Sequence, residues 1–119
     1  MRNIINKYAG IPFSYGTDCC QFVGECVEYF TGRNPASEFK YNGERGANEL
    51  IASYGTLKDL ICSVYGEPYD KAKDGDIALC ERTDGYQLAA VVFNGVLVVR
   101  TPSGVMDWPL ERARYVWNT

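Results

Sequence analysis

The chain has 119 residues, of which 46% are hydrophobic and 23% are charged, and its formal net charge is −3. This size and composition are typical of a single globular domain, which we expect to span residues 1–119. The basic residues form no run, which argues against binding to nucleic acid. The longest apolar run, LAAVVF, is too short to cross a membrane.

Helical patterns fill the first half of the chain. The most informative is GTDCCQFVGECVEYF, residues 16–30, where Thr17 or Asp18 can cap a helix and Gln21 stands at capping-box spacing from Asp18. Apolar residues then recur at helical spacing, and Gly32 is expected to end the helix. Apolar spacing and terminal glycines predict helices in four segments: 2–9, 19–30, 47–55 and 57–66.

Strand patterns fill the second half. Asn94-Gly95 separates two apolar segments and is a strong hairpin signal. The segment before this turn is apolar on both faces, as expected of a covered central strand. Five strands are predicted: 76–81, 87–93, 96–100, 105–108 and 114–117. This order predicts an α+β domain, with N-terminal helices packed on one face of a C-terminal antiparallel sheet of about five strands.

Five cysteines are a high number for this length. The opening segment, MRNIINKYAGIPF, lacks the apolar core of a signal peptide, so we expect synthesis in the cytoplasm and reduced thiols. No CxxC pair and no histidine occur, so we expect no metal site and no cofactor. Three cysteines on apolar stripes or in strands are expected in the core: Cys26, Cys62 and Cys80.

The other two cysteines, Cys19 and Cys20, open the helix predicted at 19–30. Cys19 directly follows the cap residue Asp18, where the positive end of the helix dipole favours the nucleophilic thiolate. Cys20 lies about 100° further round the helix, and from this we predict that the pair does not share one site. Acyl transfer also needs a general base. Without histidine only Asp, Glu, Lys or Tyr can serve, and the sequence places none of them.

The combination of YGTDCCQFV, a helix, DGDIAL and a strand hairpin resembles the NlpC class of papain-like cysteine peptidases, which cleave peptide bonds in bacterial cell walls. The family motif at the helix start is matched by Asp18, Cys19, Cys20, Gln21 and Phe22. The resemblance implies a papain-like fold, with Cys19 at the nucleophile position and Gly75-Asp76 before the first core strand. It places Gln87 where the family has its histidine, and the third polar member near Val99 or Arg100.

Gln87 forms hydrogen bonds but cannot take up a proton at neutral pH, so the resemblance implies a nucleophile position without its base. Asp18, Tyr15 and Tyr86 are expected to line the cleft. Asp76 is expected to cap a turn, a frequent role of aspartate.

The segments GIPFSYGTDC, TGRNPA and WPLERARYVW resemble a branch of this family found in bacteriophage genomes. This implies a catalytically degenerate domain that is a structural or accessory protein of the virion, in the tail or neck. It would be made in the host cytoplasm and would join other virion proteins in a homo- or hetero-oligomeric assembly.

Two alternatives stay open. One is an active cysteine hydrolase or acyltransferase on cell-wall peptides with a non-histidine base. The other is a cytoplasmic assembly factor that binds a partner through the old cleft. Loss of a positioned acid–base group costs about 10²- to 10⁴-fold in rate, which favours the degenerate domain.

Overall fold

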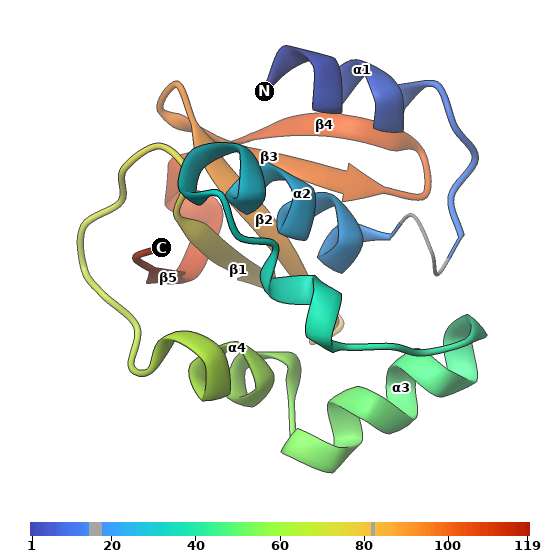
Figure 1. Cartoon of the computed structure of the whole chain (residues 1–119). Helices are drawn as coiled ribbons and strands as arrows, with labels where there is room; N and C mark the ends of the chain where they lie inside the picture. The colour runs from blue at the N-terminus through green and yellow to red at the C-terminus, as the bar shows by residue number, and fades with distance from the viewer. Residues whose placement is uncertain (15–17, 82) are drawn as a thin grey trace.

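A computed structural model describes residues 1–14, 18–81 and 83–119. Within these residues it confirms the α+β fold, with four α-helices followed by a five-stranded antiparallel sheet (Figure 1). The helices are α1 (Arg2–Ala9), α2 (Cys19–Thr31), the 3₁₀ helix η1 (Pro35–Glu38), α3 (Gly43–Tyr54) and α4 (Leu57–Tyr65). The remaining elements are β1 (Ile77–Glu81), β2 (Gln87–Phe93), β3 (Val96–Thr101), β4 (Gly104–Pro109), the 3₁₀ helix η2 (Leu110–Arg112) and β5 (Ala113–Trp117).

Local capping contacts explain where the helices begin and end. The Asp18 carboxylate accepts a hydrogen bond from the backbone N–H of Gln21 at 3.0 Å, which fixes the start of α2. Gly32 ends this helix in the left-handed conformation, with φ at 83°. A reciprocal capping box between Thr56 and Asp59 begins α4.

The sheet has the strand order β4-β3-β2-β1-β5, and neighbouring strands are antiparallel. Strands β1 to β4 form the predicted meander, and β5 returns to pair with β1. Asn94, with φ at 52°, and Gly95 form the turn between β2 and β3. The central strand β2 is buried along most of its length, as its apolar sequence predicts.

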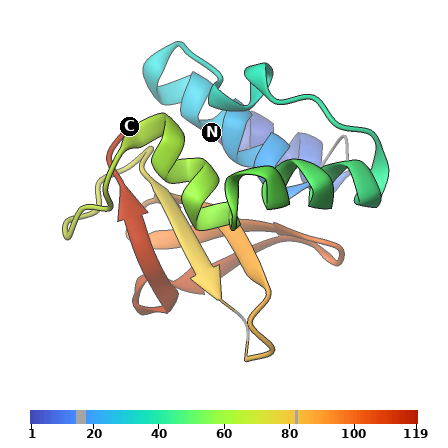
Figure 2. The same cartoon turned by 90° about the horizontal axis from the view of Figure 1, so that it is seen from below.

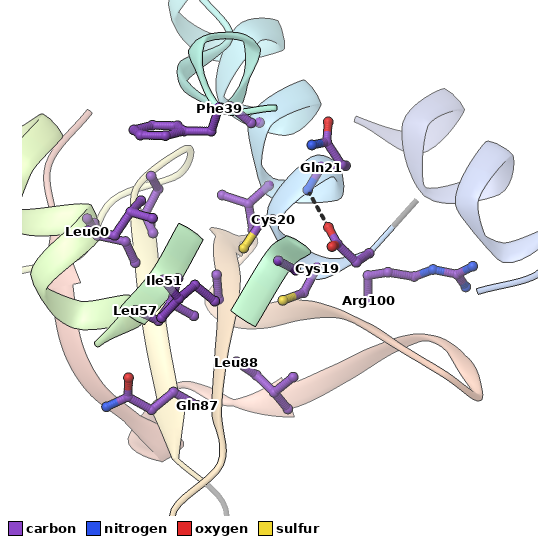
Figure 3. Close-up of a pocket in the computed structure, with 18 of the residues that line it drawn as sticks. Cys19, Cys20, Gln21, Phe39, Ile51, Leu57, Leu60, Gln87, Leu88 and Arg100 are labelled. Carbon is purple, nitrogen blue, oxygen red and sulfur yellow. Dashed lines mark hydrogen bonds between the residues drawn. The ribbon is translucent and has the colours of Figure 1, made fainter. Parts of the chain in front are cut away.

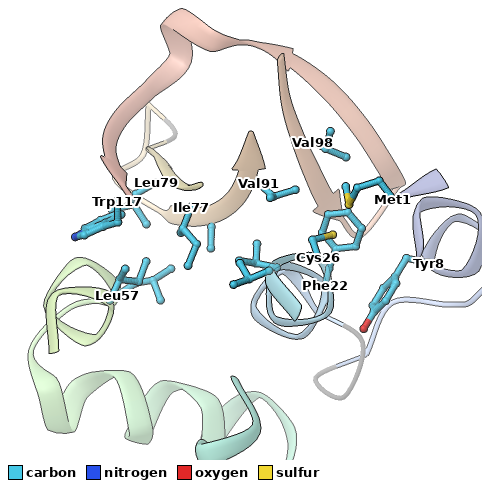
Figure 4. Packing of buried hydrophobic residues seen from close by; sticks show 14 residues of the cluster. Met1, Tyr8, Phe22, Cys26, Leu57, Ile77, Leu79, Val91, Val98 and Trp117 are labelled. Atoms are coloured by element: carbon cyan, nitrogen blue, oxygen red, sulfur yellow. The ribbon is translucent and has the colours of Figure 1, made fainter. Parts of the chain in front are cut away.

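The main core lies between the helices and one face of the sheet (Figures 2 and 4). Helix α2 packs on β2 and β3, and its residues Phe22 and Cys26 lie in the same buried cluster as Val91 and Val98. Leu57 extends this cluster to α4. Burial raises the pKa of the Cys26 thiol to about 12, so this cysteine is an inert core residue, as predicted.

The opposite face of the sheet is also covered, as the apolar character of both faces of β2 predicts, but the sequence did not show which elements cover it. Its buried residues are Ala78, Cys80, Ala90, Val92, Leu97 and Val99. Trp108 of β4, Leu110 of η2 and Val116 of β5 pack against them. The two edge strands and their connection therefore build a second small core. This arrangement depends on how distant strands meet, which local patterns do not encode.

Asp76 fixes the entry into β1. Its fully buried carboxylate accepts hydrogen bonds from the backbone N–H and Nζ of Lys73, at 3.0 and 2.6 Å. It also accepts from Asn118 Nδ2 at 2.7 Å and from the backbone N–H of Thr119 at 3.1 Å. Burial raises the pKa of Asp76, but these hydrogen bonds outweigh burial and hold that pKa below its ordinary value. The predicted turn role of Asp76 is confirmed, and it also ties the C-terminal residues to β1.

Candidate functional site

A cavity of about 540 Å³ lies between α2, the α3–α4 pair and the sheet (Figure 3). Its lining is mostly apolar, and α3 and α4 contribute aliphatic side chains that include Ile51, Leu57 and Leu60. The first turn of α2 contributes both Cys19 and Cys20. A cavity of this volume and lining is typical of sites that hold a small organic ligand.

Strands β2 and β3 are not hydrogen-bonded to each other over their whole length. The pairing begins at their connecting turn and ends at Val91 and Val98, although both strands continue beyond this pair. Ala89 lies beyond it on β2, and its backbone amide hydrogen-bonds to the Cys19 thiol. The cavity reaches the part of β2 beyond this pair, because Leu88, from the other face of β2, also lines it.

The two thiols at the start of α2 form a pair. The S–H of Cys20 hydrogen-bonds to the sulfur of Cys19, and this bond is the main cause that lowers the pKa of Cys19. The amide of Ala89 lowers it further, against the effects of burial and of the Asp18 charge. The same hydrogen bond, with burial, raises the pKa of Cys20 well above its ordinary value. Cys19 is therefore the thiol of the pair that ionises first.

Our prediction that Cys19 and Cys20 do not share one site is wrong. Both side chains point into the same cavity (Figure 3) and hydrogen-bond to each other. Successive helix residues are separated by about 100° around the helix axis, but both of these cysteine side chains line the cavity. The pair therefore consists of one thiol poised to ionise and one that acts as its hydrogen-bond donor.

The other residues predicted for the cleft lie at different places. Gln87 and Tyr86 line the cavity, and Tyr86 is 50% exposed. The amide of Gln87 points away from the Cys19 sulfur (Figure 3). The residue of β2 that hydrogen-bonds to Cys19 is Ala89. Tyr15 lies outside the described residues.

Asp18 lines the cavity, but its carboxylate is held by the fold. It accepts hydrogen bonds from the backbone N–H of Gln21 at 3.0 Å and from the hydroxyl of Tyr41 at 2.7 Å. Burial raises the pKa of Asp18 despite these bonds. Burial and the bond to Asp18 likewise raise the pKa of Tyr41. The charge of Asp18 opposes ionisation of Cys19, so this carboxylate does not help to form the thiolate.

Arg100 is a buried cation at the side of the cavity. It is 1% exposed, and its Nη2 donates a hydrogen bond to the carbonyl of Ile11 at 2.8 Å. Its guanidinium lies 5.7 Å from the ring of Phe13 and 5.9 Å from that of Tyr8. It thereby holds residues 11–13, which follow α1. The sequence signal for this residue is a charge at the end of the otherwise apolar strand VLVVR.

Two general features of the described part of the chain bear on function. It contains no group of three or more side chains that can ligate a metal ion. None of its helices combines the length and the apolar character needed to cross a membrane.

The fold and the site define an α+β domain with a thiol pair at the wall of an apolar cavity. A family model described as a domain of unknown function, DUF6950, matches residues 1–119, and the chain belongs to the DUF6950 family. No curated protein and no solved structure gives a significant match. The family description names no activity, so the similarity to NlpC peptidases stays a prediction from the sequence.

Proposed function

We propose that this domain is a catalytically degenerate relative of the papain-like peptidases that uses its cavity to bind a ligand rather than to hydrolyse one. The observation that carries the proposal is the surroundings of the Cys19 thiol. It meets the backbone amide of Ala89 and a second thiol, and the chain has no histidine. Hydrolysis of an amide needs a group that takes the proton of the nucleophile and returns it to the leaving amine.

Asp18 is a poor substitute for that missing base. Its carboxylate is buried and holds both the start of α2 and the hydroxyl of Tyr41. A carboxylate engaged in this way is not free to rotate towards a substrate without loss of the helix cap. The cavity itself supports a binding role, because its apolar walls favour a ligand that is removed from water.

The setting we propose is a bacteriophage particle. The domain is then a structural or accessory protein of the tail or neck, made in the host cytoplasm and assembled with other virion proteins. The sequence resemblance supports this setting. Quantitative mass spectrometry of purified particles tests it, with a fixed copy number expected. Absence from the particles, with presence in the infected cell, would favour an assembly factor.

A second candidate is an active cysteine hydrolase or acyltransferase, and the lowered pKa of Cys19 favours it. Incubation of the chain with cell-wall peptide fragments separates the two candidates. We expect release of products no faster than with Cys19→Ala. Turnover that is lost in Cys19→Ala and kept in Cys62→Ala would support the enzyme. Cys62 is a suitable control because it is a half-buried thiol on α4 that is not part of the cavity lining.

A further inference from the structure

The cavity pairs an apolar volume with one ionisable nucleophile. The side chains of Ile51, Leu57, Leu60 and Leu88 form much of its apolar surface, and Cys19 and its hydrogen-bond donor lie at its wall. Buried apolar area is the dominant favourable term when a hydrocarbon chain leaves water. A ligand that fits this lining has a hydrocarbon body and an electrophilic end that reaches the thiol pair.

The absent base limits which electrophile can react. An amide nitrogen leaves only after it is protonated, which needs a positioned acid. A thiol has a pKa of about 8.5 and leaves as the thiolate without that help. Among acyl donors, a thioester is therefore suited to Cys19, because one thiolate replaces another at the carbonyl carbon.

We infer that Cys19 accepts an acyl group of medium chain length from an acyl thioester and that the cavity holds the hydrocarbon chain. The Cys19 thiolate attacks the thioester carbonyl carbon. A new sulfur–carbon bond forms, the carbon–sulfur bond of the donor breaks, and the donor sulfur leaves as a thiolate. This thiolate takes up a proton equivalent to the one that Cys19 released, so no oxidant or reductant is needed.

Two features of the site support this step. Cys19 is the first residue of α2, so a carbonyl group bonded to its sulfur would be near the positive end of the helix dipole, and helix N-termini stabilise anions. Tyr86 and Met106 line the cavity and are 50% and 44% exposed, so the cavity has an open side through which a donor can enter. The inference rests on the proposed non-hydrolytic role: without a base to activate water, the acyl group stays on Cys19.

The test is acylation of the purified full-length chain by octanoyl-coenzyme A, with acetyl-coenzyme A as the short-chain comparison. Intact mass and peptide mapping report which cysteine is modified, and neutral hydroxylamine removes a thioester. We expect one acyl group, on Cys19, added at least about tenfold faster from the octanoyl donor, because burial of the longer chain adds binding free energy. Cys62→Ala should be acylated like the wild type, and Cys19→Ala should not be acylated at the α2 start.

A second variant keeps the test informative. Leu60→Gln places an amide in the apolar wall and should reduce the preference for octanoyl over acetyl, while alkylation of Cys19 by iodoacetamide is retained. Equal rates for the two donors, or equal acylation of Cys62 and Cys19, would overturn the inference and leave the proposed function intact. Release of more than one equivalent of free octanoate per chain would instead contradict the non-hydrolytic function, and with it the persistence of the acyl group.

Discussion

Replacing Cys20 with alanine removes the S–H group that hydrogen-bonds to the Cys19 sulfur. This bond is the main cause that lowers the pKa of Cys19. Hydrogen bonds to charged groups contribute about 1.5–3 kcal/mol, and S–H is a weak donor, so we take the lower end of this range. About 1.4 kcal/mol corresponds to a tenfold change in an ionisation equilibrium. The thiolate fraction of Cys19 at neutral pH should therefore fall by about tenfold.

The rate of alkylation should fall less than the thiolate fraction. A thiolate becomes more nucleophilic as its pKa rises, with a Brønsted coefficient of about 0.4–0.5, so a tenfold loss of thiolate gives about a three- to fourfold slower reaction. The midpoint of the pH profile is the more direct measure. In the wild type we expect this midpoint for Cys19 below the ordinary thiol value of about 8.5, and in Cys20→Ala we expect it to be higher.

Peptide-resolved mass spectrometry after iodoacetamide pulses at a series of pH values gives both quantities. Cys62→Ala is the matched control and should leave the profile of Cys19 unchanged. The same midpoint for Cys19 in the wild type and in Cys20→Ala would show that the S–H group of Cys20 does not stabilise the Cys19 thiolate. Faster reaction of Cys20 than of Cys19 in the wild type would show that Cys19 is the hydrogen-bond donor of the pair.

Three further predictions concern stability. Asp76→Ala should lower the free energy of unfolding, measured by urea denaturation, by about 3–5 kcal/mol. The control Asp74→Ala should lower it by about 1 kcal/mol, because the exposed carboxylate of Asp74 accepts one hydrogen bond from a backbone N–H. The pKa of Asp76 is lowered by folding, so its contribution is present above the unfolded value of about 3.9 and is lost as the pH falls through the folded pKa. Acid unfolding of Asp76→Asn should lack this component, and equal acid profiles would contradict it. Gly24→Ala should lower the free energy of unfolding by about 1–3 kcal/mol. The new Cβ would clash with Oδ1 of Asn34 and would lie 2.7 Å from the Cβ of Ala36. An unchanged urea midpoint would show that η1 moves away without cost.

Much of the fold follows from signals that act over a few residues. The capping contact between Asp18 and Gln21 forms as the spacing predicts, and Asn94-Gly95 forms the turn between β2 and β3. The strand segments were predicted to within a residue or two of the structure, because alternation and turn residues are local properties. The chain order of helices and strands was then sufficient for the α+β class.

The site was less accessible to sequence reasoning, because it depends on where α2 lies along β2. The resemblance places Gln87 at the histidine position, but the backbone of Ala89, further along the same strand, hydrogen-bonds to Cys19. The cavity depends on the α3–α4 pair and on the end of the β2–β3 ladder at Val91. These are contacts between distant segments, and no local pattern in a single sequence reports them.

The start of α2 serves folding and thiol chemistry at the same time, and the two needs conflict at Asp18. Its carboxylate caps the helix, yet its charge raises the pKa of Cys19. The hydrogen bonds from Cys20 and from the amide of Ala89 lower the pKa of Cys19, and their effect is larger than that of the Asp18 charge. The Cys19 thiolate is thus stabilised by a neighbouring thiol and a strand amide instead of a charged base. Such an arrangement favours a thiol that reacts once with an electrophile and keeps the product, over a thiol that turns over with water.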